Sequence, residues 1–262
     1  MKLTFLGTGT SSGVPVIGCH CAVCESRDPR DRRYRTSALL ETATTRILID
    51  CGPDFREQIL PMPFRKFDGV LLTHAHYDHV GGLDDLRPFC KFGDMQIYGN
   101  ARTVHTVEHN FPYCFAEHPY PNTPKFNMHV IRPHERFSIG DVDVMPIEVV
   151  HDNPPAESGR KPLLILGYRF GSLAYITDMK TIADTELPYL DGVGTLVVNA
   201  LRWDKPHHSH QLVADAIAFS RRIGAKRTFI IHMTHQIGLH EDCNRRLPEG
   251  FELAYDGEEI EL

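Results

Sequence analysis

Short apolar runs bounded by polar residues in the first part of the chain predict several short, buried strands. Each is an apolar or β-branched run ending at glycine or a polar side chain, as expected for a strand inside a sheet. The predicted strands are 3–7 (LTFLG), 37–42 (SALLET), 45–52 (TRILIDCG) and 67–74 (FDGVLLTH). Residues 54–62 are a short helix candidate, and 81–93 begin helically.

A second series of strands follows the middle of the chain. The predicted elements are a hairpin over 137–151 with its turn at IGD (139–141), two strands over 163–178 around Gly171, and strands over 195–201 and 228–232. Residues 210–226 predict a helix, because Leu212, Ala216 and Phe219 recur at helical spacing and a glycine ends the segment. Residues 100–130 show no clear periodicity.

Two groups of strands with interspersed helices favour two sheets packed face to face and flanked by helices. A doubly wound parallel sheet is the alternative. It is disfavoured because LGTGTSSG (6–13) lacks the following helix and the glycine spacing of a dinucleotide-binding turn. With 262 residues, 42% of them hydrophobic, and no repeat or linker, we expect a single domain over 1–262.

Charge and composition narrow the function classes. The formal net charge of -6 disfavours a broad nucleic-acid surface. The exception is RDPRDRRYR (27–35), with five arginines, which we interpret as a solvated, charge-mixed loop, with a small anion-contacting patch as the alternative. No apolar run reaches the roughly 18 residues of a membrane span. The opening segment lacks a signal peptide's long apolar region, so a cytoplasmic location is expected.

The stretch LLTHAHYDHVGG (71–82) places four metal-capable side chains within six positions. On an extended backbone His74 and His76 point the same way and can bind one ion. Asp78 and His79, on the following turn, can reach a second ion a few ångströms away.

Three distant residues offer the further ligands that a catalytic metal centre needs. His151, Asp178 and His232 each stand at the C-terminal end of an apolar strand. A rigid sheet presents groups at that position to a shared cleft.

HAHYDH resembles the H-x-H-x-D-H motif of the metallo-β-lactamase superfamily, and the three distant residues follow in that family's order. The resemblance implies an α/β fold, the four-layer αββα sandwich, with two divalent ions (Zn²⁺ or Mn²⁺) at one edge. It implies ligands for one ion from His74, His76 and His151, ligands for the other from Asp78, His79 and His232, and a bridging Asp178.

Such a centre suits hydrolysis. Two ions lower the pKa of a bridging water, which gives hydroxide at neutral pH, and neutralise charge on a phosphoryl oxygen. Asp78 would both bind an ion and orient this hydroxide. Histidine at position 76 sets aside the di-iron oxidoreductase relatives, which usually carry glutamate there.

Three of the seven cysteines cluster in CHCAVC (19–24), while the others are scattered. In a reducing compartment, Cys19, Cys21 and Cys24 favour metal over disulfides. A structural zinc needs a fourth ligand. His235 is free to supply it, His20 is the sterically awkward rival, and unpaired thiols are the remaining alternative.

The motif set resembles one branch of the superfamily, the cyclic phosphodiesterase of the carbon–phosphorus lyase pathway, beside ribonuclease Z. That branch implies hydrolysis of small cyclic or nucleotide-type phosphodiesters, and commonly a homodimer. It implies a general-acid histidine ahead of the helix over 210–226. His210 fits best and His207 is the reserve, with helix capping and loop solvation as the alternative.

Two other functions stay open. A tRNA 3′-processing endonuclease of the ribonuclease Z type is disfavoured by the acidic charge, by the lack of a long Gly- and Pro-rich insertion, and by Met179 where threonine is usual. A cofactor-biosynthesis protein of the pyrroloquinoline quinone pathway type also carries C-x-C-x2-C. The full ligand set and a candidate general acid count against that function.

Overall fold

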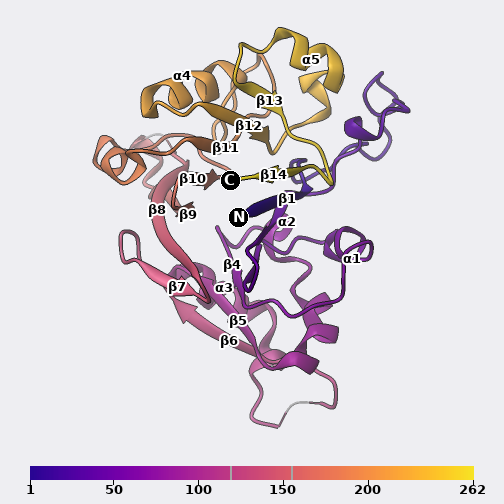
Figure 1. Cartoon of the computed structure of the whole chain (residues 1–262), viewed down its shortest axis with the longest axis vertical. Helices are drawn as coiled ribbons and strands as arrows, with labels where there is room; N and C mark the ends of the chain where they lie inside the picture. The colour runs from indigo at the N-terminus through magenta and orange to yellow at the C-terminus, as the bar shows by residue number, and fades with distance from the viewer. Residues whose placement is uncertain (119, 155) are drawn as a thin grey trace.

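In the computed structural model, which describes residues 1–118, 120–154 and 156–262, the chain forms two seven-stranded mixed sheets packed face to face (Figure 1). The first, in the order β14-β1-β2-β3-β4-β5-β6, comprises β1 (Lys2–Gly7), β2 (Ser37–Glu41), β3 (Arg46–Ile49), β4 (Gly69–Leu71), β5 (Met95–Gly99), β6 (Phe126–Val130) and β14 (Glu259–Glu261). The second, in the order β13-β12-β11-β10-β9-β8-β7, comprises β7 (Phe137–Ile139), β8 (Val142–Asp152), β9 (Leu163–Phe170), β10 (Leu173–Ile176), β11 (Thr195–Asn199), β12 (Arg227–Ile231) and β13 (Phe251–Leu253).

Short helices connect and cover these strands. The α-helices are α1 (Phe55–Ile59), α2 (Tyr77–Val80), α3 (Ala101–Asn110), α4 (Val213–Ile223) and α5 (His240–Arg246). The 3₁₀ helices are η1 (Pro29–Asp31), η2 (Leu83–Phe92), η3 (Pro112–Phe115), η4 (Ala156–Ser158), η5 (Asp184–Leu190) and η6 (His235–Ile237). None of the helices in the described ranges has the length and apolar character that crossing a bilayer requires.

Strand alternation explains why both faces of each sheet are apolar. On β2, Ala38 and Leu40 belong to the core between the sheets, while Leu39 belongs to the core beneath the outer helices. On β11, Val197 faces the inner core while Leu196 and Val198 face outward. Because successive strand side chains point to opposite faces, a fully apolar strand must be covered on both sides.

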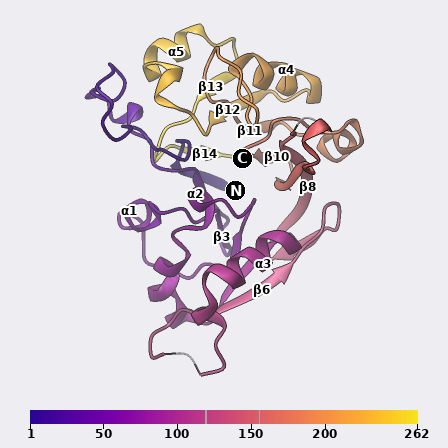
Figure 2. The ribbon, with the colours of Figure 1, turned by 180° about the vertical axis from the view of Figure 1, so that it is seen from behind.

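Helices supply that outer cover. On the second sheet, α4 buries Val213, Ala216 and Phe219 and ends at Gly224, whose φ is 72°. On the first sheet, η2 and α3 pack outside, and Figure 2 shows α3 lying over β6. The predicted αββα sandwich is therefore confirmed.

Most predicted strands are present, but several elements were missed. β5, α3 and β6 all lie within or beside 100–130, where no periodicity was evident. α3 buries only Thr103, Val104 and Val107, so its apolar face is narrow. β13 and β14 have three residues each and depend on pairing with β12 and β1, which a local pattern does not reveal.

The interpretation of 27–35 as a solvated loop was wrong in part. Arg33 is buried, and its guanidinium donates to the carbonyl oxygen of Ala254 at 2.7 Å. Arg35 forms an ion pair of 2.8 Å with Asp54. These two arginines tie the N-terminal loop to distant segments of the chain.

Candidate active site

The first group of predicted ligands lies where β4 and β8 end. His74 Nε2 and His76 Nδ1 are 3.0 Å apart, and His151 Nε2 lies 3.3 Å from the same nitrogen of His76. The register of β8 shifts between Val150 and Asp152, and such a bulge re-aims the intervening side chain. His74 and His151 are buried, whereas His76 is exposed, so this group opens to solvent at His76.

The second group joins α2 to the end of β12. The Nε2 atoms of His79 and His232 lie 3.4 and 3.5 Å from the same carboxylate oxygen of Asp78. All three side chains are buried.

Asp178 lies between the two groups, and each of its carboxylate oxygens faces one of them. One oxygen is 3.9 Å from Nε2 of both His74 and His151. The other is 3.4 Å from Nε2 of His79 and 3.2 Å from Nε2 of His232. The structure therefore brings together all seven predicted ligands.

Backbone geometry helps to aim these side chains. His232 directly follows β12, Asp178 lies two residues after β10, and each has φ of 55°. Non-glycine residues rarely adopt this left-handed conformation, and such residues concentrate at functional sites.

The donor set fits divalent metal ions. Within both groups the ligand atoms lie within 4.8 Å of one another. Among the described residues, Nε2 of His79 and of His232 are buried without a hydrogen-bond partner, an arrangement that a bound cation would satisfy. Imidazole nitrogen and carboxylate oxygen are ligands that suit zinc, and carboxylate oxygen also suits manganese.

The charge distribution also favours a cation here. Burial alone would raise the pKa of Asp178, but the imidazoles of His232 and His79 hold it well below its ordinary value. Burial alone would lower the pKa of His79, but Asp178, Asp78 and Asp50 hold it well above the ordinary value. The carboxylates thus stay ionised and require positive charge beside them.

Asp50, which sequence reasoning missed, orients a predicted ligand. This fully buried residue follows β3 with φ of 58°, and its carboxylate lies 2.8 Å from His79 Nδ1. It also accepts hydrogen bonds of 2.8 Å from the backbone N–H and hydroxyl of Thr73. Its signal was visible, because RILID ends in an acidic residue after an apolar strand, as AYITD does.

Replacing Asp50 with asparagine should weaken metal binding by roughly 10–100-fold, the range for groups that orient metal ligands. The side-chain shape is kept while the charge facing His79 is lost. Competition with a chromogenic chelator measures the affinity. Asp68→Asn is the control, since Asp68 binds the backbone N–H of Arg46 outside the site. Equal affinity for wild type and Asp50→Asn would remove the orienting role.

His210 lies against the same centre. Its Nδ1 is 3.9 Å from an oxygen of Asp178, and its ring centroid lies 4.9 Å from that of His151. Burial lowers the pKa of His210 to about 2, against the opposing effect of Asp178. The reserve residue His207 lies one ring further out, 5.2 Å from His210 between centroids.

A separate cluster joins the cysteine loop to η6. The sulfur atoms of Cys19, Cys21 and Cys24 lie 3.3, 3.2 and 3.6 Å from Nδ1 of His235. The rival His20 instead contacts Glu25 and is largely exposed. The backbone N–H of Cys24 and the imidazole of His235 lower the pKa of Cys21, which favours the metal-binding thiolate. This set fits one structural zinc.

Cys21→Ser should cost stability rather than chemistry, because structural zinc contributes folding free energy. A loss of about 2 kcal/mol lowers the melting temperature by roughly 4–8 °C in a chain of this size. Calorimetry and initial rates measure both properties, with Cys90→Ser as a thiol control outside the cluster. A reduced kcat with an unchanged melting temperature would instead place the cysteines in the reaction.

Comparison with known families shows which protein family has this chain as a member. Residues 45–233 match the model of the β-lactamase superfamily domain. This range runs from β3 past the end of β12 and contains all seven predicted ligands. The chain belongs to the metallo-β-lactamase superfamily. The resemblance inferred from its motifs is confirmed.

Three proteins with different names are similar to this chain. A solved diphosphatase of the PhnP family is 39% identical, with a TM-score of 0.87, and the match covers 99% of this chain and 96% of that one. An octanoyltransferase of Porphyromonas gingivalis is 42% identical over 98% of this chain and 51% of that protein. Ribonuclease Z of Methanococcus maripaludis is 30% identical over 59% of this chain and 46% of that protein. The chain thus spans about half the length of these two curated relatives.

Proposed function

We propose that this protein hydrolyses small phosphodiesters, cyclic or nucleotide-type, with two divalent ions, Zn²⁺ or Mn²⁺, held by the seven ligands. The observation that carries the proposal is the position of Asp178. One of its carboxylate oxygens faces the imidazoles of the first group and the other faces those of the second group. When bound, two such ions supply an activated water and neutralise charge developing on the phosphoryl oxygens.

The chain's own residues would position the reacting groups. Asp78 is buried and faces the centre, so its carboxylate can hold a water and accept its proton. The exposed His76 marks the side from which a diester can enter. The buried walls around His79 and His232 exclude bulk water, which strengthens electrostatic interactions in the site.

His210 is the proposed general acid for the leaving alkoxide. Its ring borders the centre between His151 and His232, on the segment that precedes α4. A phosphodiester anion beside the ring would raise the pKa of His210 and so oppose the effect of burial. The same position would also permit metal ligation, because His151, Asp178 and His210 form a group of possible ligands.

The comparisons support phosphoryl chemistry in general. The name of the PhnP-family neighbour describes a diphosphatase, so diphosphate bonds belong among the bonds to be tested. We do not propose octanoyl transfer for this chain, because about half of the P. gingivalis protein lies outside the match. Free cysteines suit a reducing, cytoplasmic compartment, and the resemblance implies a homodimer, which light scattering would measure.

The runner-up function is tRNA 3′ processing, supported by the ribonuclease Z match. The net charge of -6 weighs against it, because tRNA binding depends on phosphate contacts from a basic surface. A cofactor-biosynthesis role of the pyrroloquinoline quinone type is the third possibility.

A substrate panel separates these functions. Chelator-treated protein is reloaded with Mn²⁺ or Zn²⁺ and given cyclic and linear phosphodiesters, diphosphates and a precursor tRNA. We expect metal-dependent turnover of small diesters. Cleavage of the precursor tRNA alone would favour the ribonuclease, and turnover of none would favour the third function.

A further inference from the structure

Among the described residues, no hydrogen bond holds the imidazole of His210 in place. Its Nδ1 atom is buried without a partner, and the carboxylate oxygen of Asp178 stands 3.9 Å away, beyond hydrogen-bonding range. The ring packs between His151 and His232, with centroids 4.9 and 4.8 Å away. The position of the ring therefore depends on the backbone of the segment that carries it.

That segment relies on other parts of the chain for its shape. Residues 203–212 form neither helix nor strand. The carbonyl oxygen of Ser209 lies 3.2 Å from Nδ1 of the ligand His151, which must donate because a carbonyl oxygen only accepts. The carbonyl oxygen of Gln211 accepts from the backbone N–H of Leu201 at 3.0 Å. The carbonyl groups on either side of His210 are thus fixed from outside the segment.

A lysine holds the carbonyl group between these two. Nζ of Lys180 donates to the carbonyl oxygen of His210 at 3.2 Å. Within the described part of the chain, the half-buried Lys180 ammonium makes this hydrogen bond and forms no ion pair. A hydrogen bond from a charged donor is stronger than one between neutral groups, so this contact can restrain the backbone at His210.

The backbone from which Lys180 extends is itself well fixed. The N–H groups of Lys180 and Thr181 both donate to the carbonyl oxygen of Val150, at 2.8 and 3.1 Å, and the N–H of Val150 donates to Thr181 at 2.9 Å. The side-chain amide of Asn199 pairs with both backbone polar groups of Met179, at 2.7 and 3.1 Å. Lys180 therefore projects from a rigid point two residues beyond the bridging aspartate.

We infer that Lys180 is a positioning residue, which holds the backbone of His210 so that its imidazole stays where a departing alkoxide can take its proton. The inference rests on the proposed phosphodiesterase function, in which His210 is the general acid. Lys180 acts through His210 and does not touch the reacting atoms. A displaced acid costs rate only where the leaving group needs a proton, so the loss should depend on the leaving group.

Matched pairs of substrates test the inference. In Lys180→Met, hydrolysis of alkyl diesters should slow by roughly 10–100-fold relative to p-nitrophenyl diesters, with both ions retained. Lys180→Arg should stay closer to wild type, because a guanidinium also donates and keeps the charge. Equal slowing of both substrate types in Lys180→Met would overturn the inference, since the ammonium would then act on the substrate or on the fold as a whole.

The matched control is Lys226→Met. Lys226 is exposed and precedes β12, at the end of that strand opposite to His232. This variant should keep the wild-type ratio between the two substrate types.

A double-mutant cycle separates action through His210 from an independent effect. In the His210→Ala background the acid is already absent, so Lys180→Met should change the leaving-group ratio no further. If Lys180→Met changed the ratio as much in that background as in wild type, its effect would not pass through His210, and the inference would be overturned.

Hydrogen exchange separates this inference from the proposed function. If metal-loaded wild type hydrolyses none of the diesters, the proposed function fails, and amide exchange over residues 203–212 still reports on Lys180. Exchange there should be roughly 10-fold faster in Lys180→Met than in wild type or Lys226→Met, because losing a hydrogen bond to a charged group eases local opening. Equal exchange in all three proteins would overturn the inference.

Discussion

Asp78→Ala is expected to reduce phosphodiester hydrolysis by more than roughly 100-fold, beyond the loss typical of residues that only orient ligands. Asp78 contributes the carboxylate oxygen shared by His79 and His232, so its removal would disrupt the second ion's site and the positioning of water together. The fold should persist, because among the described residues the contacts of the Asp78 carboxylate are with His79 and His232 of the ligand cluster. Initial rates, circular dichroism and metal content measure the three effects.

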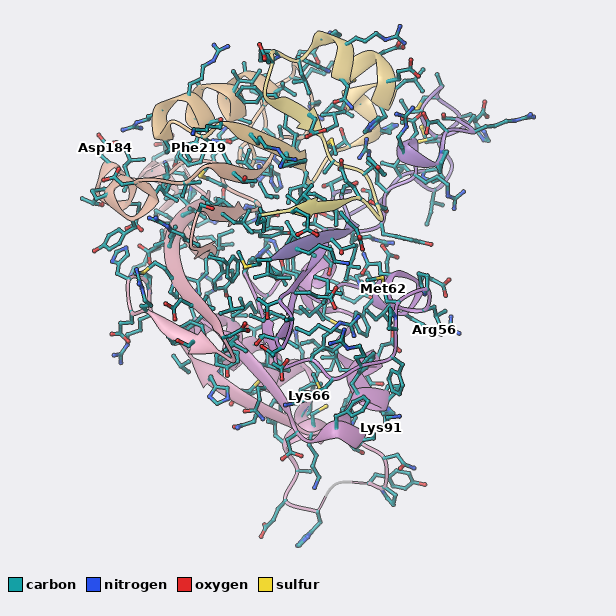
Figure 3. The ribbon with its side chains drawn as sticks, in the orientation of Figure 1. Arg56, Met62, Lys66, Lys91, Asp184 and Phe219 are labelled. Carbon is teal, nitrogen blue, oxygen red and sulfur yellow. The ribbon has the colours of Figure 1, made fainter. Side chains whose placement is uncertain are left out.

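The matched control is Asp184→Ala. Asp184 is an exposed carboxylate on η5 that pairs with Arg222, and Figure 3 shows it at the edge of the molecule opposite Arg56. This variant should keep wild-type turnover. Near-native hydrolysis by Asp78→Ala would show that the assignment of the two metal groups is wrong.

His210→Ala is expected to slow diesters with alkoxide leaving groups by roughly 10²–10⁴-fold, the usual contribution of positioned proton transfer. An alkoxide is strongly basic and needs a proton as it departs, whereas p-nitrophenolate is weakly basic and needs little help. The variant should therefore hydrolyse p-nitrophenyl diesters far better than alkyl or ribosyl diesters. Rates on matched pairs of substrates, together with metal content, measure this selectivity.

Two outcomes would remove the acid role from His210. Equal losses on both substrate types with both ions retained would do so, and loss of an ion would make His210 a ligand instead. His207→Ala serves as the comparison, because the His207 ring lies next to that of His210, 5.2 Å away between centroids and tilted by 35°. If the dependence on leaving group followed His207→Ala, the role would belong to His207.

The sequence predicted those parts of the fold that carry a local pattern. β2, β3 and β11 each contain an uninterrupted apolar run of three residues because both of their faces are buried, and that run is visible without a structure. α3 buries few residues, and β14 gains its hydrogen bonds from β1 at the other end of the chain. Their stability comes from tertiary partners, so no local signal marks them.

The same distinction holds at the site. The H-x-H-x-D-H motif and the three strand-end ligands were recognisable because each follows an apolar run. The support of His79 by Asp50 was not, since it depends on β3 and β4 being parallel neighbours. The roles of the seven ligands, of His210 and of the cysteine cluster remain predictions.

A metal titration coupled to turnover tests the central claim most directly. The protein is purified gently, its zinc, manganese and iron are counted per chain, and chelated protein is reloaded stepwise while diester hydrolysis is followed. We predict up to three ions per chain, one in the cysteine cluster and two at the seven ligands, with hydrolysis rising as the last two bind. Protein that holds none of these metals, or hydrolysis that does not change with their occupancy, would contradict the proposed two-metal phosphodiesterase.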